Sequence, residues 1–395
     1  MNPLFILSLI LFLGTLQTGV CQNIIDDDEL DLKLPPTELS TNDLDKLLNY
    51  LPNKKTIGTF EGIFTCVQRK LENQIKLTIS NWPLMPFHHT LGISGYEVYF
   101  NHPDELFYSL SIALPYLSKD TCELVKKFLA EQAKILPAYS INGFDNQIGR
   151  PRESYDVPFN LRISGHGVAK STFGVYAFWN WCYFTGDYEP AKAHYHAIKS
   201  RMHSLLDGDY KFDIYNADYV NDEAEKLNGD LAGIIGFIRL ARLNGDDEAA
   251  KMAIDVGTKL LNLRINLERV NVKIVTKTSD TKSLHIYKLA RYSDLVPEIC
   301  EGLREFCEGV AEKRVYAYRS ARNGWYMAFG DRLIGGENYT NPLHFGRAIF
   351  CGAALIEKLD AEKLASFVDV PHCIGDLYFI EKCSLVLRSC AESSK

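Results

Sequence analysis

The sequence lacks the signatures of several familiar chemistries. It has no glycine-rich phosphate loop, no Gly-x-Ser-x-Gly element, no His-Glu-x-x-His and no paired Cys-x-x-Cys. These absences weigh against nucleotide-dependent, serine-hydrolase and zinc-protease functions. An excess of positive charge is also missing, because 43 Lys and Arg residues stand against 50 Asp and Glu. Nucleic acid is therefore not expected as a partner.

Long hydrophobic runs are confined to the amino-terminal end. Leu4 to Leu16 form a nearly unbroken apolar run, which small and polar residues follow up to Gln22. The run is shorter than the roughly 20 residues that span a bilayer, but it is typical of a secretory signal peptide. We predict a signal peptide over 1–21, an acidic extended leader over 22–40 and no membrane span. The expected location is extracellular, or periplasmic in a bacterium.

Cysteine is also sparse for a secreted scaffold. Ten cysteines in 395 residues are too few for a disulfide framework, and the Cys and His spacings fit no zinc pattern. We expect neither a metal nor a cofactor. The sequon at Asn338 predicts N-glycosylation on a solvent-facing loop.

Helical periodicity dominates from about residue 40 onward. Apolar residues recur at helical spacing over 168–183 and again over 227–238, where Gly229, Gly233 and Gly236 would let a neighbouring helix approach closely. The aromatic run 178–181, which includes Asn180, is interpreted as core packing. The best strand pattern is formed by Val270, Val272, Ile274 and Val275, which predict a β-hairpin or an irregular insertion near 269–288.

A weak internal repeat sets the predicted architecture. Gly186-Asp187-Tyr-Glu recurs as Gly245-Asp246-Asp-Glu, in which glycine ends one helix and aspartate caps the next. Related caps are predicted near Thr59, Asp120, residue 294 and Asp360. The intervals of roughly 50–65 residues predict about six αα-hairpins in a single domain over 41–395.

In its length, hairpin count and aromatic-rich helices, the chain resembles the (α/α)6-toroid enzymes, which include six-hairpin glycosidases and helical polysaccharide lyases. The resemblance is one of pattern over residues 40–390 and carries no catalytic position with it. It implies an all-α fold of repeated αα-hairpins, an (α/α)5-6 toroid, and a poly- or oligosaccharide substrate.

The candidate site lies in the long connections between hairpins, because long loops in compact domains are usually functional. His166 stands between two glycines at a predicted helix start, where the helix amino end would lower the pKa of the imidazole. The proposed acid–base residues are Glu153, His166, Asp213, Asp218, Asp331 and Glu337. The proposed substrate-binding residues are Trp82, His88, His89, Arg150, Arg152, Tyr215, Trp325 and Tyr339.

Three functions remain open at this point. A glycoside hydrolase would use two of the five carboxylates as acid and base, and this is the leading hypothesis because carboxylates outnumber histidines. A polysaccharide lyase would neutralise a uronate with Arg150 or Arg152 and abstract a proton through His166 or a tyrosine. A non-catalytic protein would instead present a concave helical surface to a glycan or a protein. The oligomeric state is not predicted.

Overall fold

The computed structural model describes residues 38–81, 103–140, 171–208, 220–277, 296–307, 350, 352–368 and 377–393. No strand occurs within these ranges, which confirms the predicted all-α class for them. The longer helices are α2 (Thr41–Leu48), α3 (Ile63–Asn81), α6 (Pro103–Ala113), α7 (Lys119–Ile135), α9 (Phe173–Thr185), α11 (Tyr195–Asp207), α12 (Val220–Leu243), α13 (Asp247–Lys277), α15 (Pro297–Phe306) and α19 (Leu377–Ser393). The short elements are η1 (Leu114–Tyr116), α10 (Glu189–Ala193), the π-helical turn η3 (Gly352–Ile356), α18 (Ala361–Ala365) and η4 (Ser366–Val368).

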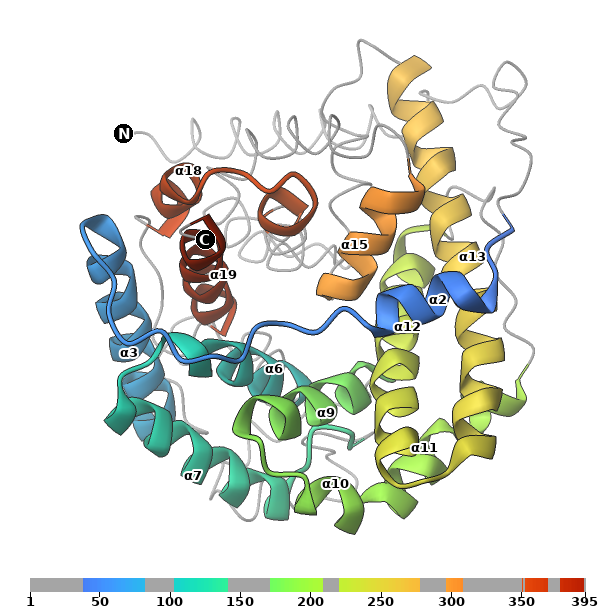
Figure 1. The fold of residues 1–395 in the computed structure, drawn as a ribbon, viewed down its shortest axis with the longest axis horizontal. Helices are drawn as coiled ribbons and strands as arrows, with labels where there is room; N and C mark the ends of the chain where they lie inside the picture. Colours follow the sequence, from blue (N-terminus) through green and yellow to red (C-terminus); the bar gives the residue numbers. More distant parts are fainter. Residues whose placement is uncertain are drawn as a thin grey trace, which may run out of the picture. The chain divides into compact units, whose positions relative to one another are not determined.

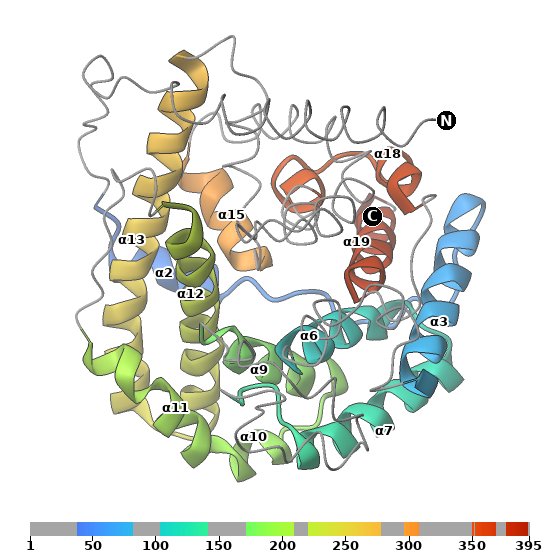
Figure 2. The same cartoon turned by 180° about the vertical axis from the view of Figure 1, so that it is seen from behind.

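The contacts between helices divide the longer helices into two groups, which can be followed in Figures 1 and 2. In the first group, α6 lies between α19 and α9, α9 lies between α6 and α12, and α12 also contacts α15. In the second group, α3 packs on α19, α7 packs on α3, and α11 and α13 pack on α12. We call α6, α9, α12, α15 and α19 the inner helices.

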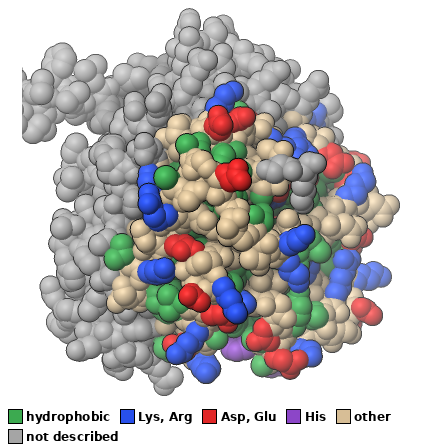
Figure 3. All heavy atoms as spheres, turned by 60° about the vertical axis from the view of Figure 1, so that its left-hand side comes forward, with side chains coloured by type: hydrophobic (Ala, Val, Ile, Leu, Met, Phe, Trp, Pro, Cys, Tyr) green, Lys and Arg blue, Asp and Glu red, His purple; other side chains and the backbone are tan. Residues whose placement is uncertain are grey.

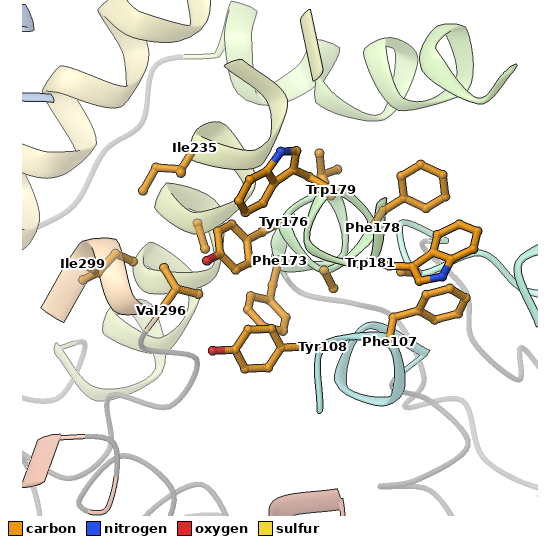
Figure 4. Close-up of a cluster of buried hydrophobic side chains, with 14 of the residues drawn as sticks. Phe107, Tyr108, Phe173, Tyr176, Phe178, Trp179, Trp181, Ile235, Val296 and Ile299 are labelled. Atoms are coloured by element: carbon orange, nitrogen blue, oxygen red, sulfur yellow. The ribbon is translucent and has the colours of Figure 1, made fainter. Parts of the chain in front are cut away.

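The composition of α9 explains its place among the inner helices. Its residues 173–182 are buried on every side, whereas α7 buries only the face that carries Val125 and Leu129. A helix that is apolar all round must be enclosed by other elements, and a helix with one apolar stripe covers a surface. Figure 4 shows aromatic side chains of α9 reaching Phe107 on one side and approaching Ile235 on the other.

The predicted glycine–aspartate turns are confirmed. Gly186 and Gly245 have positive φ angles of 72° and 70°, which glycine adopts without steric cost. The Asp187 carboxylate accepts a hydrogen bond from the backbone of Glu189, and Asp246 accepts one from the backbone N–H three residues later. Both repeats therefore form tight connections, α9 to α10 and α12 to α13.

The other predicted caps have mixed outcomes. Asp360 caps α18 by accepting the backbone N–H of Glu362. The prediction for Asp120 is wrong, because α7 begins at Lys119 after Ser118 and Asp120 lies within its first turn. Thr59 begins no helix, since α3 starts at Ile63. The turn expected near residue 294 lies outside the described residues.

The predicted β-hairpin is wrong over 269–277, because α13 continues without interruption to Lys277. The β-branched residues Val270 and Val272 have modest strand propensity, but propensity yields to the context of a long helix packed along α12. The remainder of the predicted hairpin, 278–288, lies outside the described residues.

The three helical glycines of α12 allow the close helix contact that the sequence predicts. A β-carbon at Gly229 or Gly233 would collide with Ser171 or Thr172, and one at Gly236 would lie 2.6 Å from the backbone of Tyr176. The residue numbers of the contacting pairs increase in the same direction along α9 and α12, so the two helices run parallel.

Residues 49–62 join α2 to α3 without forming a helix or strand, and we call this segment the strap. It hydrogen-bonds to Pro115 of η1, through Ile57, and to the hydroxyl of Tyr183 on α9, through the Pro52 carbonyl. The strap also accepts hydrogen bonds from Arg239 of α12 and Arg388 of α19. The strap therefore contacts the carboxy-terminal part of the α6–η1 segment and of three inner helices. The amino-terminal ends of α6, α9 and α12 are the ends at which the long connecting segments enter.

Acidic and basic side chains are interspersed on the face drawn in Figure 3, where no broad region of one sign appears. Many exposed pairs have helical spacing, as for Lys192 with Glu189 and Lys126 with Glu123. Such pairs contribute little to stability in water.

Candidate functional site

The residues predicted to form the site lie outside the described part of the chain. They occupy the segments that precede α6, α9, α12 and Phe350, so the structure neither brings them together nor separates them. This set comprises Trp82, His88, His89, Arg150, Arg152, Glu153, His166, Asp213, Tyr215, Asp218, Trp325, Asp331, Glu337, Asn338 and Tyr339.

The described residues enclose a different site, a pocket among the inner helices. It is a small site with an enclosed cavity volume of about 20 Å³, room for a water-sized group, and the space around that cavity is open to solvent. Three helical stripes with a spacing of four residues supply most of the wall, so each helix turns the same face to the pocket. The lining consists of Tyr108, Ile112, Tyr116, Tyr176, Asn180, Phe184, Ser384, Leu385 and Arg388, with Pro52 and Asn53 from the strap and Pro297 from α15.

Asn180 is the unusual member of this lining. It is fully buried on α9, and neither its amide nitrogen nor its carbonyl oxygen has a hydrogen-bond partner within the described part of the chain. Buried polar atoms are nearly always paired, because an unpaired one loses its hydration without replacement. Asn180 therefore offers one free donor group and one free acceptor group at the pocket.

A buried ion pair stands beside this pocket. Arg239 donates to Glu298 at 2.5 Å, and the Tyr176 hydroxyl donates to the other Glu298 oxygen at 2.8 Å. Glu298 is fully buried, and the side chain of Arg239 is only 9% exposed. Burial, followed by the charge of Glu298, raises the pKa of Tyr176 well above its usual value. The carboxylate is therefore fully engaged and Tyr176 stays protonated.

Arg239 also holds the strap. Its second terminal nitrogen donates to the carbonyls of Leu48 at 3.0 Å and Tyr50 at 2.7 Å. The guanidinium carbon lies 4.0 Å from the centre of the Trp179 ring, a cation–π contact. Ion pair, ring and carbonyls together fix this guanidinium in one position.

The second arginine, Arg388, is also neutralised by a carboxylate. Its Nε donates to Glu392 at 2.8 Å, and a terminal nitrogen donates to the Tyr50 hydroxyl. Burial opposes the charge of Arg388, but Tyr50 and Glu392 outweigh this and raise its pKa. Burial also raises the pKa of Tyr116, so this hydroxyl is protonated at neutral pH.

The pocket is consequently aromatic, polar and balanced in charge. The one arginine in its described lining, Arg388, pairs with Glu392, and no Asp or Glu belongs to that lining. Protonated tyrosines and a free amide can donate and accept hydrogen bonds, but they supply no general base. The arrangement suits the binding of an uncharged polar group.

The sequence predicted that Asn180 and its aromatic neighbours are buried, and this is confirmed. It did not predict the pocket, because the pocket needs side chains from α6, α9 and α19 that lie far apart in the chain. One local signal was present. An asparagine inside the apolar run Phe178-Trp179-Asn180-Trp181 is expensive to bury unless something pairs with it.

Within the described residues, no group of three His, Cys, Asp or Glu side chains converges as a metal site requires. Of the helices described, none has the length and apolar character to cross a membrane.

The described residues define a broad class, an all-α protein with an aromatic pocket among the inner helices. Comparison with known protein families, with curated proteins and with solved structures finds no match to this chain. The functional argument therefore depends on the site itself.

Proposed function

We propose that the protein is a secreted carbohydrate-active enzyme that cleaves glycosidic bonds in a poly- or oligosaccharide by hydrolysis. The observation that carries this proposal is the aromatic, charge-balanced pocket with the free amide of Asn180. Aromatic rings present flat apolar surfaces to the C–H faces of a sugar, and amide and hydroxyl groups bind its polar edge.

The charge balance favours hydrolysis of a neutral glycan over cleavage of a uronate. A lyase needs a free cation to neutralise the substrate carboxylate, but Arg388, the one arginine in the described lining of the pocket, is already paired with Glu392. Arg150 and Arg152 stay the candidates for that role in the lyase alternative.

In this proposal the pocket binds a polar group at the edge of a sugar, and the reacting carboxylates come from the long connections. Two of Glu153, Asp213, Asp218, Asp331 and Glu337 act as general acid and as base or nucleophile. His166 is a further acid–base candidate. The candidate substrate-binding residues are Trp82, His88, His89, Tyr215, Trp325 and Tyr339. The segments that carry Glu153, Asp213 and Asp218 lead directly into α9 and α12.

The proposed architecture is an (α/α) toroid. Its support is the order of contacts among the inner helices, in which α19 packs on α6, α6 on α9, α9 on α12 and α12 on α15. The turn η3 contacts both α15 and α19, which is the position that would complete a ring. A closed ring would place the pocket at its centre, where a substrate could approach from the ends at which the connections enter.

A second candidate function is non-catalytic glycan binding. It is favoured by the absence of Asp and Glu from the described lining of the pocket. Secretion through the 1–21 signal peptide and glycosylation at Asn338 belong to both proposals.

A panel of polysaccharides tests these functions, with new reducing ends and the ultraviolet absorbance of unsaturated uronates as two separate readouts. Hydrolysis predicts reducing ends alone, whereas both signals together would identify a lyase. Replacing each of the five carboxylates by its amide should lower the rate about 10²–10⁴-fold at two positions only. Glu189→Gln, on the exposed surface of α10, is the control. A folded protein that binds glycans and cleaves none would establish the second function.

A further inference from the structure

We propose that the pocket is a hydration site, in which the side-chain amide of Asn180 binds one water molecule. The starting point is the pair of unpartnered amide atoms. Asn180 is fully buried on α9 within the lining of the pocket, and among the described residues neither its nitrogen nor its oxygen has a hydrogen-bond partner. Two unpaired polar atoms in the interior would each cost a desolvation penalty, which a bound group that both accepts and donates removes.

The size of the pocket selects the ligand. Its enclosed volume is about 20 Å³. One water needs roughly 10–15 Å³ of such space, so the pocket has room for a single water and for little more. Apolar cavities stay dry, whereas a polar cavity that offers a water several hydrogen-bonding partners retains it. The amide of Asn180 makes this pocket one of the polar kind.

The geometry of a primary amide suits one water. One hydrogen of its NH₂ group points to the same side as its carbonyl oxygen, so a single water can accept from the nitrogen and donate to the oxygen. Asn180 alone therefore supplies two of the roughly three hydrogen bonds that a buried water makes.

The lining also provides an acceptor for the second hydrogen of the water. The Tyr176 hydroxyl donates to Glu298 at 2.8 Å, and the Ser384 hydroxyl donates to the Ile380 carbonyl at 2.8 Å. Both side chains belong to the lining, and both oxygens keep lone pairs that can accept. A water bound to Ser384 as well as to Asn180 would join α19 to α9, the two helices that α6 separates.

The charge of the lining excludes an ion of similar size. A cation would meet Arg388 and the amide nitrogen of Asn180, and no Asp or Glu of the described lining would balance it. An anion would leave the Asn180 oxygen unpaired, and Glu392 already balances the charge of Arg388. A neutral water pairs with both amide atoms and buries no additional charge.

The position of the pocket gives this water a structural role. Pro52 and Asn53 of the strap belong to the lining, so the pocket lies toward the carboxy-terminal parts of the inner helices. The connections that carry the proposed acid–base residues enter at the opposite, amino-terminal ends. The inference does not depend on the proposed function, in which a hydroxyl group of the ligand would have to replace this water.

The test is magnetic relaxation dispersion of the water oxygen, measured on the full chain without glycan, which counts the waters that stay bound far longer than those at the surface. Asn180→Leu keeps the branched shape of the side chain and removes both hydrogen-bonding atoms. We expect this variant to hold one long-lived water fewer than the natural protein. Equal counts in the two folded proteins would overturn the inference.

A second measurement uses the natural protein alone and does not need the variant to fold. The side-chain NH₂ resonances of Asn180, assigned by triple-resonance NMR, should show an Overhauser effect to water with the sign of a long-lived complex. Assigned resonances without that effect would contradict the proposed site.

Asn228→Leu is the matched control. Asn228 is an equally buried asparagine on α12, but its side-chain carbonyl accepts a hydrogen bond from Arg264 at 2.7 Å. Its replacement should lower the melting temperature and leave the count of long-lived waters unchanged. Loss of one water in this variant too would assign the change to loosened packing and not to Asn180. A bound water without cleavage of any polysaccharide would contradict the proposed enzyme alone, and cleavage without a bound water would contradict this inference alone.

Discussion

At the scale of single residues, the described interior contains a few buried charged groups that pair with one another. Glu298 has no exposed surface, and it receives Arg239 on one oxygen and Tyr176 on the other. Removing one member of such a pair costs more than the pair contributes, because the other charge is left without compensation. The same kind of pair at the surface is worth little.

Arg239→Met should therefore lower the free energy of unfolding by about 3–5 kcal/mol in denaturant titration. Adding Glu298→Gln should restore much of that loss, because it removes the uncompensated charge. Arg242→Met is the control on the same helix, since Arg242 pairs with Asp45 while both side chains are more than 40% exposed. A loss of comparable size at Arg242 would show that the burial of the Glu298 pair is not the cause.

Asp246 predicts a pH dependence. Hydrogen bonds from Lys199 and Tyr195 lower the pKa of its carboxyl group to about 2, below the roughly 3.9 of an unfolded chain. A lowered pKa in the folded state makes a contribution that is complete above the unfolded value and is lost as pH falls toward the folded one. Asp246→Asn should therefore lose less stability than the natural protein between about pH 4 and pH 2.

This prediction is measured by thermal melts across that interval. Glu248→Gln removes an equal charge from the same turn of α13, and its pH profile should follow that of the natural protein. Parallel profiles for all three proteins would contradict the assignment to Asp246.

At the scale of elements, the contact of α9 with α12 depends on glycine. A β-carbon at Gly236 would stand 2.6 Å from the backbone of Tyr176, which has no way to yield except by separating the helices. Gly257 on α13 is also close to its neighbours, but these are the methyl ends of Ile234 and Leu44. Side-chain ends can rotate and backbone cannot.

We expect Gly236→Ala to destabilise the protein by about 1–3 kcal/mol, which is typical of overpacking, despite the better helix propensity of alanine. Gly257→Ala should be closer to neutral, because the gain in propensity offsets a small rearrangement. Denaturant midpoints of the two variants measure the difference, and a larger loss at Gly257 would refute the argument.

Features set by a few neighbouring residues, such as turns and caps, were predictable from the sequence. Features that depend on packing against distant segments were not. The turns at Gly186 and Gly245 were found because a glycine with positive φ and a capping aspartate act within a few residues. The strand expected after Val270 failed because three alternating β-branched residues cannot outweigh a helix of 31 residues packed on α12. The cap predicted at Asp120 lies two residues after the observed N-cap, Ser118, an ordinary error for a helix boundary.

At the scale of the whole molecule, the site was the least predictable part. Sequence reasoning could place Asn180 in the core, but the pocket joins Tyr108, Asn180 and Ser384, which no spacing rule connects. The long connections attracted the functional predictions because they are rich in ionisable and aromatic residues. Their candidates stay predictions, and the carboxylate and binding experiments above address them.

The strap also permits a prediction at this scale. Lys54 and Lys55 are exposed, whereas the chain before them is held by α2, whose leucines are buried, and by Arg239. Trypsin should cut the native protein after these lysines, and the fragment that contains α2 should remain bound through size-exclusion chromatography. The variant with glutamine at both positions should resist this cut. Release of the fragment under native conditions would contradict the anchoring described here.

The contact of Tyr50 with Arg388 spans 338 positions of the chain. Synthesis proceeds from the amino terminus at about 5–20 residues per second, so α2 and the strap leave the ribosome long before α19 exists. During that interval Leu44, Leu47 and Leu48 have no partner from α15 and the strap has no Arg388 to bind. The apolar face of α2 therefore stays exposed on the nascent chain until α13 and α15 are made, and the strap gains its contact with Arg388 only when α19 follows. A deletion of α19 would consequently weaken a segment that was synthesised long before it.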